Sequence, residues 1–367
     1  MDKKVSAAPQ FQDLIDAIKR NGISRQQWEN ILCVNKSIVL FIDQDRRTML
    51  HHTAFHGRTS LIELLVQQDV ELNSYNKNGE TPLFVAVVQD KVAAVEALLK
   101  AGADPEVRNQ YGETLLHVAC NSKTGILELL LKHCDCYIDA ANAEEQTPLH
   151  YAVMLEREDA VETLLNFGAN VNVADAKGRM PLHMASSRGL LKTLNLLLSH
   201  GAYVNACDNH DKIPLHYAVQ FGHMSLVQAL VQQGAKINAI DMDGIGDTPL
   251  EVAIDASRLD IVLSLLQQGA LQKETLLLVS DVAYPGRSPA ELNEEYQDIL
   301  AQYQEVGNPT RADVLWEVEQ LLIAGKSIDN GESQEFKNVM FKLMLCEQKD
   351  FLHSMRENQQ VRMSESA

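Results

Sequence analysis

The chain has 367 residues, and its 50 acidic against 32 basic side chains give a formal net charge of −18 at pH 7. Such an acidic surface repels nucleic acid and anionic membranes, so we expect no nucleic-acid partner and favour a basic or apolar protein or peptide. No apolar run is long enough to span a bilayer, and the polar residues after Lys3 and Lys4 exclude a signal-peptide core, so we expect no membrane insertion. The six cysteines are scattered, which predicts free thiols in a reducing, cytoplasmic setting.

A hexamer recurs along the chain at a fixed interval, and residues 147–152 show it in the form Thr-Pro-Leu-His-Tyr-Ala. The interval is 33 residues five times in succession and then 35. Its first position is occupied by Thr48, Thr81, Thr114, Thr147, Met180, Ile213 and Thr248. An Asp/Asn-x-x-Gly pattern precedes the hexamer, and a Gly-Ala-x-x-Asn pattern follows the next two helical stretches.

This pattern resembles the ankyrin repeat, whose period and Thr-Pro-Leu-His-x-Ala core it matches. The resemblance covers residues 43–270 as seven repeats and implies an all-α fold, an ankyrin-repeat solenoid of helix-turn-helix units with hairpin tips. Threonine is a good N-cap and proline suits the first helical turn, so each hexamer is expected to open a helix. A second amphipathic helix follows and ends at a glycine such as Gly168 or Gly234. No repeat can bury its apolar face alone, so neighbouring repeats are expected to stack.

The segments on either side of the repeats also have helical patterns. Residues 1–42 are predicted to form a tail and an N-terminal helical cap, in which Ser24 and Gln27 have capping-box spacing. Residues 271–355 lose the register but keep apolar helical stripes, and we expect this C-terminal helical extension to pack on the last repeat. It holds either decayed repeats or a separate functional domain. Residues 356–367 are polar and are expected to be disordered.

Several repeats depart from the consensus of the hexamer and of its turn. Thr53 replaces an alanine in the first repeat, Phe84 replaces the histidine in the second, and Glu145 stands at the turn glycine of the fourth. The fifth and sixth repeats begin with Met180 and Ile213, so we expect them to lose the threonine cap.

Histidine residues recur at one position of the hexamer, namely His51, His117, His150, His183 and His216. A metal or proton ladder is one interpretation, but the ankyrin resemblance implies a structural role in which these side chains hydrogen-bond neighbouring turns. His133 with Cys134 and Cys136 could supply half of a zinc site, yet further ligands are missing nearby, so we expect no metal and no cofactor. Cys346 and His353 form a conceivable thiol pair, although packing and surface roles are favoured for them.

The ankyrin resemblance implies that partners contact the hairpin tips and the inner face of the first helix in each repeat. Carried over by register, these positions include Arg47, His56, Asn78, Glu80, Val88 and Gln89. From the tips and inner helices, the candidate partner-binding residues are Phe55, Tyr111, Met154, Leu155, Arg179, Arg188, Phe221 and Met242. Aromatic, methionine and arginine side chains are enriched in interface centres, so this set favours protein binding.

We therefore expect a monomeric, non-enzymatic interaction module or scaffold that binds a protein or peptide on its inner face. An alternative is an enzyme with a helical active domain in residues 271–355, with the repeats recruiting its substrate. A structural spacer without a specific partner is a third possibility. The degenerate hexamers and the helical extension are also similar to ankyrin effectors of intracellular bacteria, which implies translocation into a host cytosol. The polar residues 362–367 are compatible with a C-terminal translocation signal.

Overall fold

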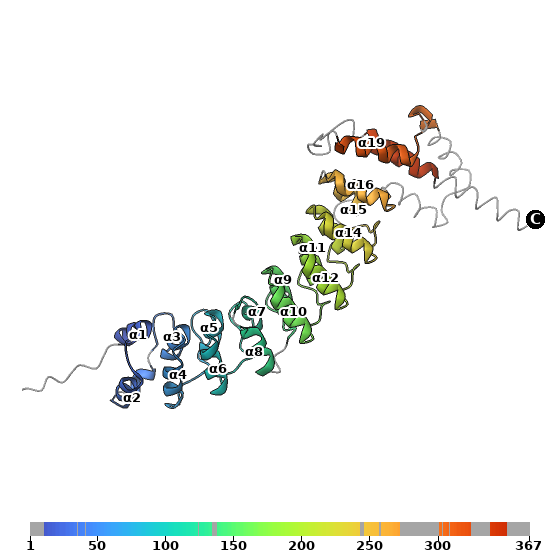
Figure 1. The fold of residues 1–367 in the computed structure, drawn as a ribbon. Helices are drawn as coiled ribbons and strands as arrows, with labels where there is room; N and C mark the ends of the chain where they lie inside the picture. Colours follow the sequence, from blue (N-terminus) through green and yellow to red (C-terminus); the bar gives the residue numbers. More distant parts are fainter. Residues whose placement is uncertain are drawn as a thin grey trace, which may run out of the picture. The chain divides into compact units, whose positions relative to one another are not determined.

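The computed structural model describes residues 11–34, 36–40, 42–123, 125–133, 138–242, 246–256, 258–271, 301–302, 304–307, 309–323 and 338–350. These ranges divide into two compact units, Met1–Ala176 (unit 1) and Lys177–Ala367 (unit 2). Figure 1 shows successive helix pairs joined by hairpin tips in each unit. Within the described ranges the regular elements are helices, with two isolated β-bridges, Ile42 to Thr48 and Arg108 to Thr114. The predicted all-α ankyrin fold is confirmed.

Unit 1 begins with the predicted helical cap and continues with four helix pairs opened by the hexamers. The cap consists of α1 (Phe11–Arg20), α2 (Arg25–Val34) and the 3-10 helix η1 (Lys36–Leu40). The pairs are α3 (Met49–Phe55) with α4 (Thr59–Val66), α5 (Pro82–Val88) with α6 (Val92–Lys100), α7 (Leu115–Ala119) with α8 (Ile126–His133), and α9 (Pro148–Met154) with α10 (Glu158–Asn166). The first helix of each pair packs on the first helix of the next, and α1 packs on α3.

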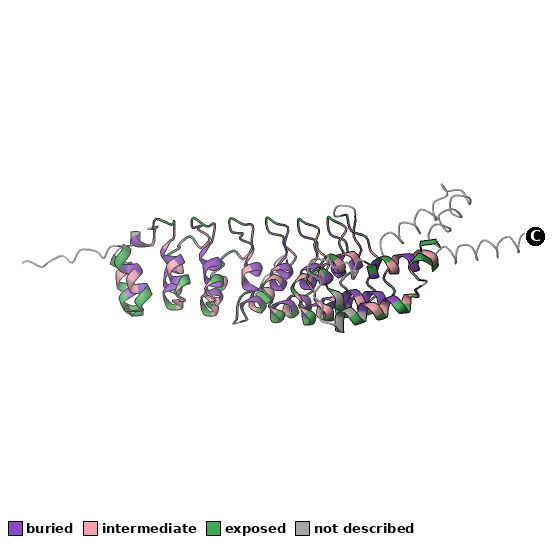
Figure 2. Cartoon of the chain, turned by 90° about the horizontal axis from the view of Figure 1, so that it is seen from above, coloured by how far each residue is buried: buried purple, intermediate pink, exposed green. Residues whose placement is uncertain are grey.

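Unit 2 contains three further pairs of the same kind. They are α11 (Pro181–Arg188) with α12 (Leu191–Ser199), α13 (Pro214–Gln220) with α14 (Met224–Gln232), and α15 (Pro249–Asp255) with α16 (Leu259–Gln267). Helix α19 (Arg311–Ile323) packs on α16. In both units buried residues line the helix faces that meet, whereas the tips carry mostly exposed and half-buried residues (Figure 2). No helix in the described part of the chain combines the length and the apolar character needed to cross a membrane.

The hexamer histidines connect each helix start to the following tip. The backbone N–H of Thr48 donates to Nδ1 of His51 (3.0 Å), so Nε2 carries the ring hydrogen and donates to the carbonyl of Glu80 (3.1 Å). The same bond from Nε2 to a carbonyl of the next tip recurs at His117, His183 and His216. The structural role predicted for the hexamer histidines is confirmed at His51, His117, His183 and His216.

The expected loss of the threonine cap at Met180 and Ile213 is confirmed. Neither side chain can accept a hydrogen bond as threonine does, so that half of the cap is absent. The backbone N–H of Met180 still donates to Nδ1 of His183 (3.0 Å), and that of Ile213 donates to Nδ1 of His216 (3.1 Å). Histidine three residues into the helix therefore maintains the other half of the capping box.

Each tip is organised by the Asp or Asn that opens it. In the tip before α5, Oδ1 of Asn76 accepts the backbone N–H groups of Asn78 (2.8 Å) and Glu80 (3.0 Å). The carbonyl of Asn78 accepts from the backbone N–H of Gln110 in the next tip (3.2 Å), so neighbouring tips are joined. Gly79 has φ +73°, a conformation in which a side chain is strained.

Arg311 links the described C-terminal helices to α16 by hydrogen bonds. Nη2 of Arg311 donates to the carbonyls of Leu266 (3.1 Å) and Ala270 (2.9 Å), which lie at the end of α16 and just beyond it. Nη1 of Arg311 pairs with Glu347 (2.7 Å), whose side chain is only 2% exposed. The remainder of the predicted 271–355 extension and the 356–367 tail lie outside the described residues.

Candidate functional site: a groove on the inner face of unit 1

A hollow of about 450 Å³ lies in unit 1, where α1, α3 and α5 meet the first two hairpin tips. We call it the α1–α5 groove. Its lining comprises Gln12, Ile15, Lys19, Asp43, Arg47, His51, His52, Phe55, His56, Asn78, Glu80, Val85, Val88 and Gln89. Its volume falls within the range of about 300–1,000 Å³ that is usual for ligand pockets, so it can receive side chains of a partner.

The floor of the groove is apolar because of the repeat register. Phe55 and Val88 are 33 residues apart and occupy the same position at the ends of α3 and α5, which pack on each other. They are 40% and 43% exposed, and Ile15 and Val85 are buried in the same lining. Two large apolar side chains therefore lie side by side at the surface, where a partner could cover them.

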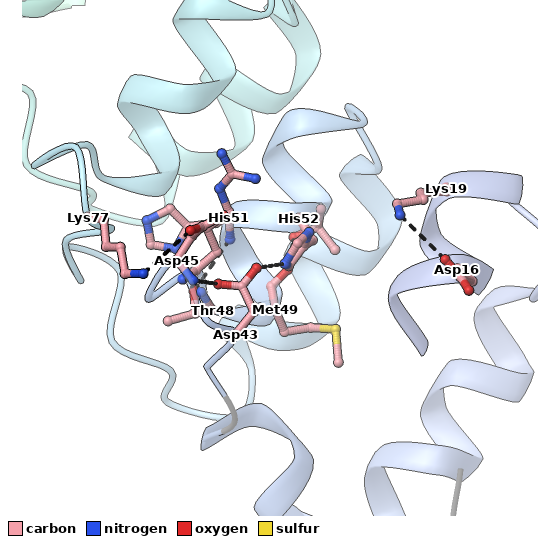
Figure 3. A network of polar contacts seen from close by, with 11 residues as sticks. Asp16, Lys19, Asp43, Asp45, Thr48, Met49, His51, His52 and Lys77 are labelled. Carbon is pink, nitrogen blue, oxygen red and sulfur yellow. Dashed lines mark hydrogen bonds and ion pairs between the residues drawn. The ribbon is translucent and has the colours of Figure 1, made fainter. Parts of the chain in front are cut away.

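Asp43 is already satisfied by internal hydrogen bonds. Its Oδ1 accepts the backbone N–H groups of Asp45 and Arg47, both at 2.8 Å. Its Oδ2 lies 3.0 Å from Nε2 of His52, as Figure 3 shows. Burial lowers the pKa of His52, and the negative charge of Asp43 opposes that shift.

Glu80, the second carboxylate of the groove, is also engaged. Its Oε2 accepts from Nδ2 of Asn76 (2.7 Å) and Nδ2 of Asn78 (3.5 Å). Its backbone carbonyl accepts from Nε2 of His51, and burial lowers the pKa of this histidine to about 4. His51 is thus neutral near pH 7 and serves as a fixed connection between helix and tip.

The cationic side chains of the groove are less constrained. Lys19 meets Asp16 at 3.4 Å, and both side chains are largely exposed. Arg47 is half-buried and lines the groove. Its hydrogen bond to Asp43 comes from the backbone N–H and does not involve the guanidinium. The ring of His56 lies edge-on to that of Phe55, with centroids 4.9 Å apart.

The electrostatic environment of His56 is positive. Burial is the main cause of its lowered pKa, and the positive charges of Arg58, His52, Lys19 and Lys91 lower this pKa further. Each of these charges disfavours protonation of the imidazole. Several basic side chains therefore lie near His56 in a chain whose net charge is −18.

The described residues do not assemble a recognisable metal or thiol centre. Within the described ranges, no group of three or more His, Cys, Asp or Glu side chains is arranged to hold a metal ion. Cys134, Cys136 and His353 lie outside these ranges. Cys346 is buried, and its thiol donates to the carbonyl of Pro309 (3.1 Å), which is a packing role.

Unit 1 holds four of the candidate binding residues, and one of them lies in the groove. Phe55 lines it. Tyr111 is exposed at the third tip, and Leu155 is exposed at the end of α9. Met154, the last residue of α9, is only half-buried and not openly exposed as expected.

The other four candidates belong to unit 2. Phe221 follows α13 and is exposed, Arg188 is exposed at the end of α11, and Met242 is exposed at its tip. Arg179 is half-buried. The structure describes these side chains in unit 2 alone, separately from the groove of unit 1.

Sequence reasoning missed the contribution of α1 to the groove. Gln12, Ile15 and Lys19 precede the repeats, so the register that identifies Phe55 and Val88 does not reach them. The signal that could have found them is the amphipathic pattern of α1 together with the requirement that a cap pack on the first repeat.

Comparison with known proteins supports this fold. The family model for ankyrin repeats (3 copies) matches residues 14–109, 95–175, 164–241 and 182–275. Human B-cell lymphoma 3 protein is 35% identical over 149 residues, which are 38% of this chain and 33% of that protein. Pig NF-kappa-B inhibitor alpha is 34% identical over 138 residues, which are 35% of this chain and 44% of the inhibitor.

A solved structure has a similar fold. The crystal structure of the ankyrin repeat domain of Bcl-3, a member of the IkappaB protein family, matches with a TM-score of 0.54 at 35% identity. The match covers 61% of this chain and all of that domain. The chain spans less than half the length of the two curated relatives described above. These similarities support a protein–protein interaction module, and because the family model matches most of the sequence, the chain belongs to the ankyrin-repeat family.

Proposed function

We propose that this chain is a non-enzymatic interaction module that holds a protein or peptide partner in the α1–α5 groove. The observation that carries the proposal is the exposed pair Phe55 and Val88 on the floor of a concave site with a polar rim. Binding energy at interfaces concentrates in a few apolar, aromatic and arginine side chains set in pockets, and Phe55 with Arg47 fits that description.

The groove is a poor candidate for catalysis. Both ring nitrogens of His51 are hydrogen-bonded to backbone groups, and its pKa of about 4 makes it a weak base. His52 is paired with Asp43. Neither histidine has an activated nucleophile beside it, because Thr48 is the hydroxyl next to His51 and acts as a helix cap. These contacts favour binding over catalysis in the groove.

The exposed side chains outside the groove extend the proposal to other contact points. Tyr111 and Leu155 in unit 1, and Arg188, Phe221 and Met242 in unit 2, are exposed at tips and helix ends. Partners of ankyrin repeats use such positions. We include them as secondary contacts, to be tested one unit at a time.

The proposal further places the protein in the cytoplasm as a monomer and includes an effector role inside a host cell. The effector role rests on the degenerate hexamers and the helical extension of the sequence. The relatives described above add no support to it.

Affinity capture followed by mass spectrometry tests the groove. We expect Phe55→Ala combined with Val88→Ala to lose a partner that the unaltered chain retains, by about 30-fold or more if about 2 kcal/mol is lost. The melting temperature should change little, because both side chains are substantially exposed. Lys100→Ala on the outer helix α6 is the matched control. Undiminished capture by the double variant would exclude the groove, and Phe221→Ala would then test unit 2.

A further inference from the structure

The carboxylates of the α1–α5 groove already accept internal hydrogen bonds. Asp43 accepts two backbone N–H groups and the imidazole of His52, and Glu80 accepts two asparagine amides. A basic side chain that displaced the donors of Asp43 would compete with two tip N–H groups. Such displacement would leave tip N–H groups unsatisfied, which is costly in a half-buried site.

The cationic hydrogen-bond donors of the groove favour an acidic partner over a basic one. The guanidinium of Arg47 and the ammonium of Lys19 line the groove beside His56, next to the apolar pair Phe55 and Val88. Arginine binds carboxylates with two parallel hydrogen bonds, and lysine adds a positive charge. Burial is the main cause of the lowered pKa of His56, and basic side chains nearby lower it further.

We propose that the partner of the α1–α5 groove is a peptide segment in which a carboxylate lies beside a large apolar side chain. This inference rests on the proposed function of the groove. The apolar side chain contacts Phe55 and Val88, and the carboxylate accepts hydrogen bonds from Arg47 and Lys19. The expectation from net charge, a basic or apolar partner, describes the whole chain, whereas this proposal concerns one site and keeps only the apolar part of that expectation.

Fluorescence anisotropy with three labelled peptides tests the charge preference. Each peptide is a Gly-Ser decapeptide with a central Leu-X-Leu, in which X is Glu, Gln or Lys. We expect the Glu peptide to bind about tenfold more tightly than the Gln peptide at low salt, and the Lys peptide to bind most weakly. Because Lys19 is exposed, part of the Glu preference should disappear as the salt concentration rises.

Two variants separate the roles of charge and apolar contact. Arg47→Gln with Lys19→Gln should remove the preference for Glu over Gln and leave binding of the Gln peptide unchanged. Phe55→Ala should weaken all three peptides by a similar factor. Lys100→Gln on α6 is the charge control and should change nothing, and thermal melting of each variant checks that the fold is intact.

The outcomes distinguish the two proposals. Equal or tighter binding of the Lys peptide, or binding of none of the three, would overturn the acidic-partner inference. If Phe55→Ala still weakens the peptides or reduces partner capture, the groove itself remains the binding site. If Phe55→Ala with Val88→Ala affects neither peptide binding nor capture, the proposed function fails as well.

Discussion

At the scale of single residues, polar groups inside the repeats are buried only with partners. Thr53 stands where the hexamer has alanine and is fully buried, yet its hydroxyl donates to the carbonyls of Met49 (3.1 Å) and Leu50 (2.9 Å). No buried side-chain nitrogen or oxygen of the described residues is without a hydrogen bond. The substitution is therefore compatible with close packing of α3.

His51 makes the stability of the protein depend on pH. Burial lowers its pKa from 6.5 to about 4, whereas the unfolded chain titrates near 6.5. The unfolded state therefore binds more protons between these values, so stability should fall as the pH drops from about 6.5 to about 4. The loss from this one residue is about 3 kcal/mol at pH 4. The pKa values of His117 and His216 are also lowered by burial and act in the same direction. Urea unfolding across this pH range measures the effect.

The second helix pair offers a control for this prediction. Phe84 occupies the histidine position there and does not titrate. His51→Phe should therefore reduce the steepness with which stability depends on pH below 6.5, whatever it does to stability at pH 7. An identical pH dependence in the variant would show that His51 is not the group responsible.

A second residue-scale prediction concerns the tip glycine Gly79. A Cβ at this position would lie 2.9 Å from the backbone nitrogen of Gln110, and φ is +73°. Gly102 has φ +89° but no heavy atom within 4 Å of its Cβ position. Both alanine variants incur left-handed strain of about 1 kcal/mol, and Gly79→Ala should lose further stability because the tips must separate. Chemical denaturation of the two variants compares them, and equal losses would contradict the tip contact.

At the scale of elements, α19 packs on α16 and the helix 338–350 runs antiparallel to α19. Arg311 near the start of α19 pairs with Glu347 near the end of the other helix, and Lys342 pairs with Glu317 (2.9 Å). Val314 and Val318 of α19 are fully buried. The last repeat thus has both its apolar face and its terminal carbonyls satisfied by this cover, as a terminal repeat requires.

The Arg311–Glu347 pair should be sensitive to removal of one partner. Arg311→Met would leave the carboxylate of Glu347 buried without its cation, at a cost of about 3 kcal/mol. Adding Glu347→Gln should recover part of this loss, because no buried charge then remains. Lys342→Met breaks the more exposed Lys342–Glu317 pair and should cost about 1 kcal/mol or less. Urea unfolding of the three variants tests the pattern, which requires Arg311→Met to lose more stability than Lys342→Met.

Truncation tests the cover as a whole. A chain ending at Ala270 loses α19 and helix 338–350, which exposes the part of α16 on which α19 packs. We expect this fragment to melt at a lower temperature and to aggregate, whereas a chain ending at residue 350 should retain its melting temperature. A soluble, monomeric fragment of residues 1–270 with unchanged melting would show that α16 needs no cover.

At the scale of the whole molecule, net charge and local charge differ. The formal charge of −18 predicts repulsion of anions from the surface as an average. In the α1–α5 groove the carboxylates are engaged with internal donors while Arg47 and Lys19 line the site. A partner recognises the groups that are available at its binding site, so composition alone could not indicate the chemistry of the groove.

The sequence by itself determined the repeat fold and the inner-face positions. The reason is that hexamers, caps and turn glycines act within a few residues of one another, and a period of 33 residues brings each position beside its equivalent in the next helix pair. Phe55 and Val88 could therefore be identified by register. Contacts outside that register were decided by tertiary structure alone. They include the position of Lys19 of α1 in the groove, the hydrogen bond between Asp43 and His52, and the ion pair between Arg311 and Glu347. Each depends on side chains that approach from different elements without periodic spacing, so only the folded chain brings them together.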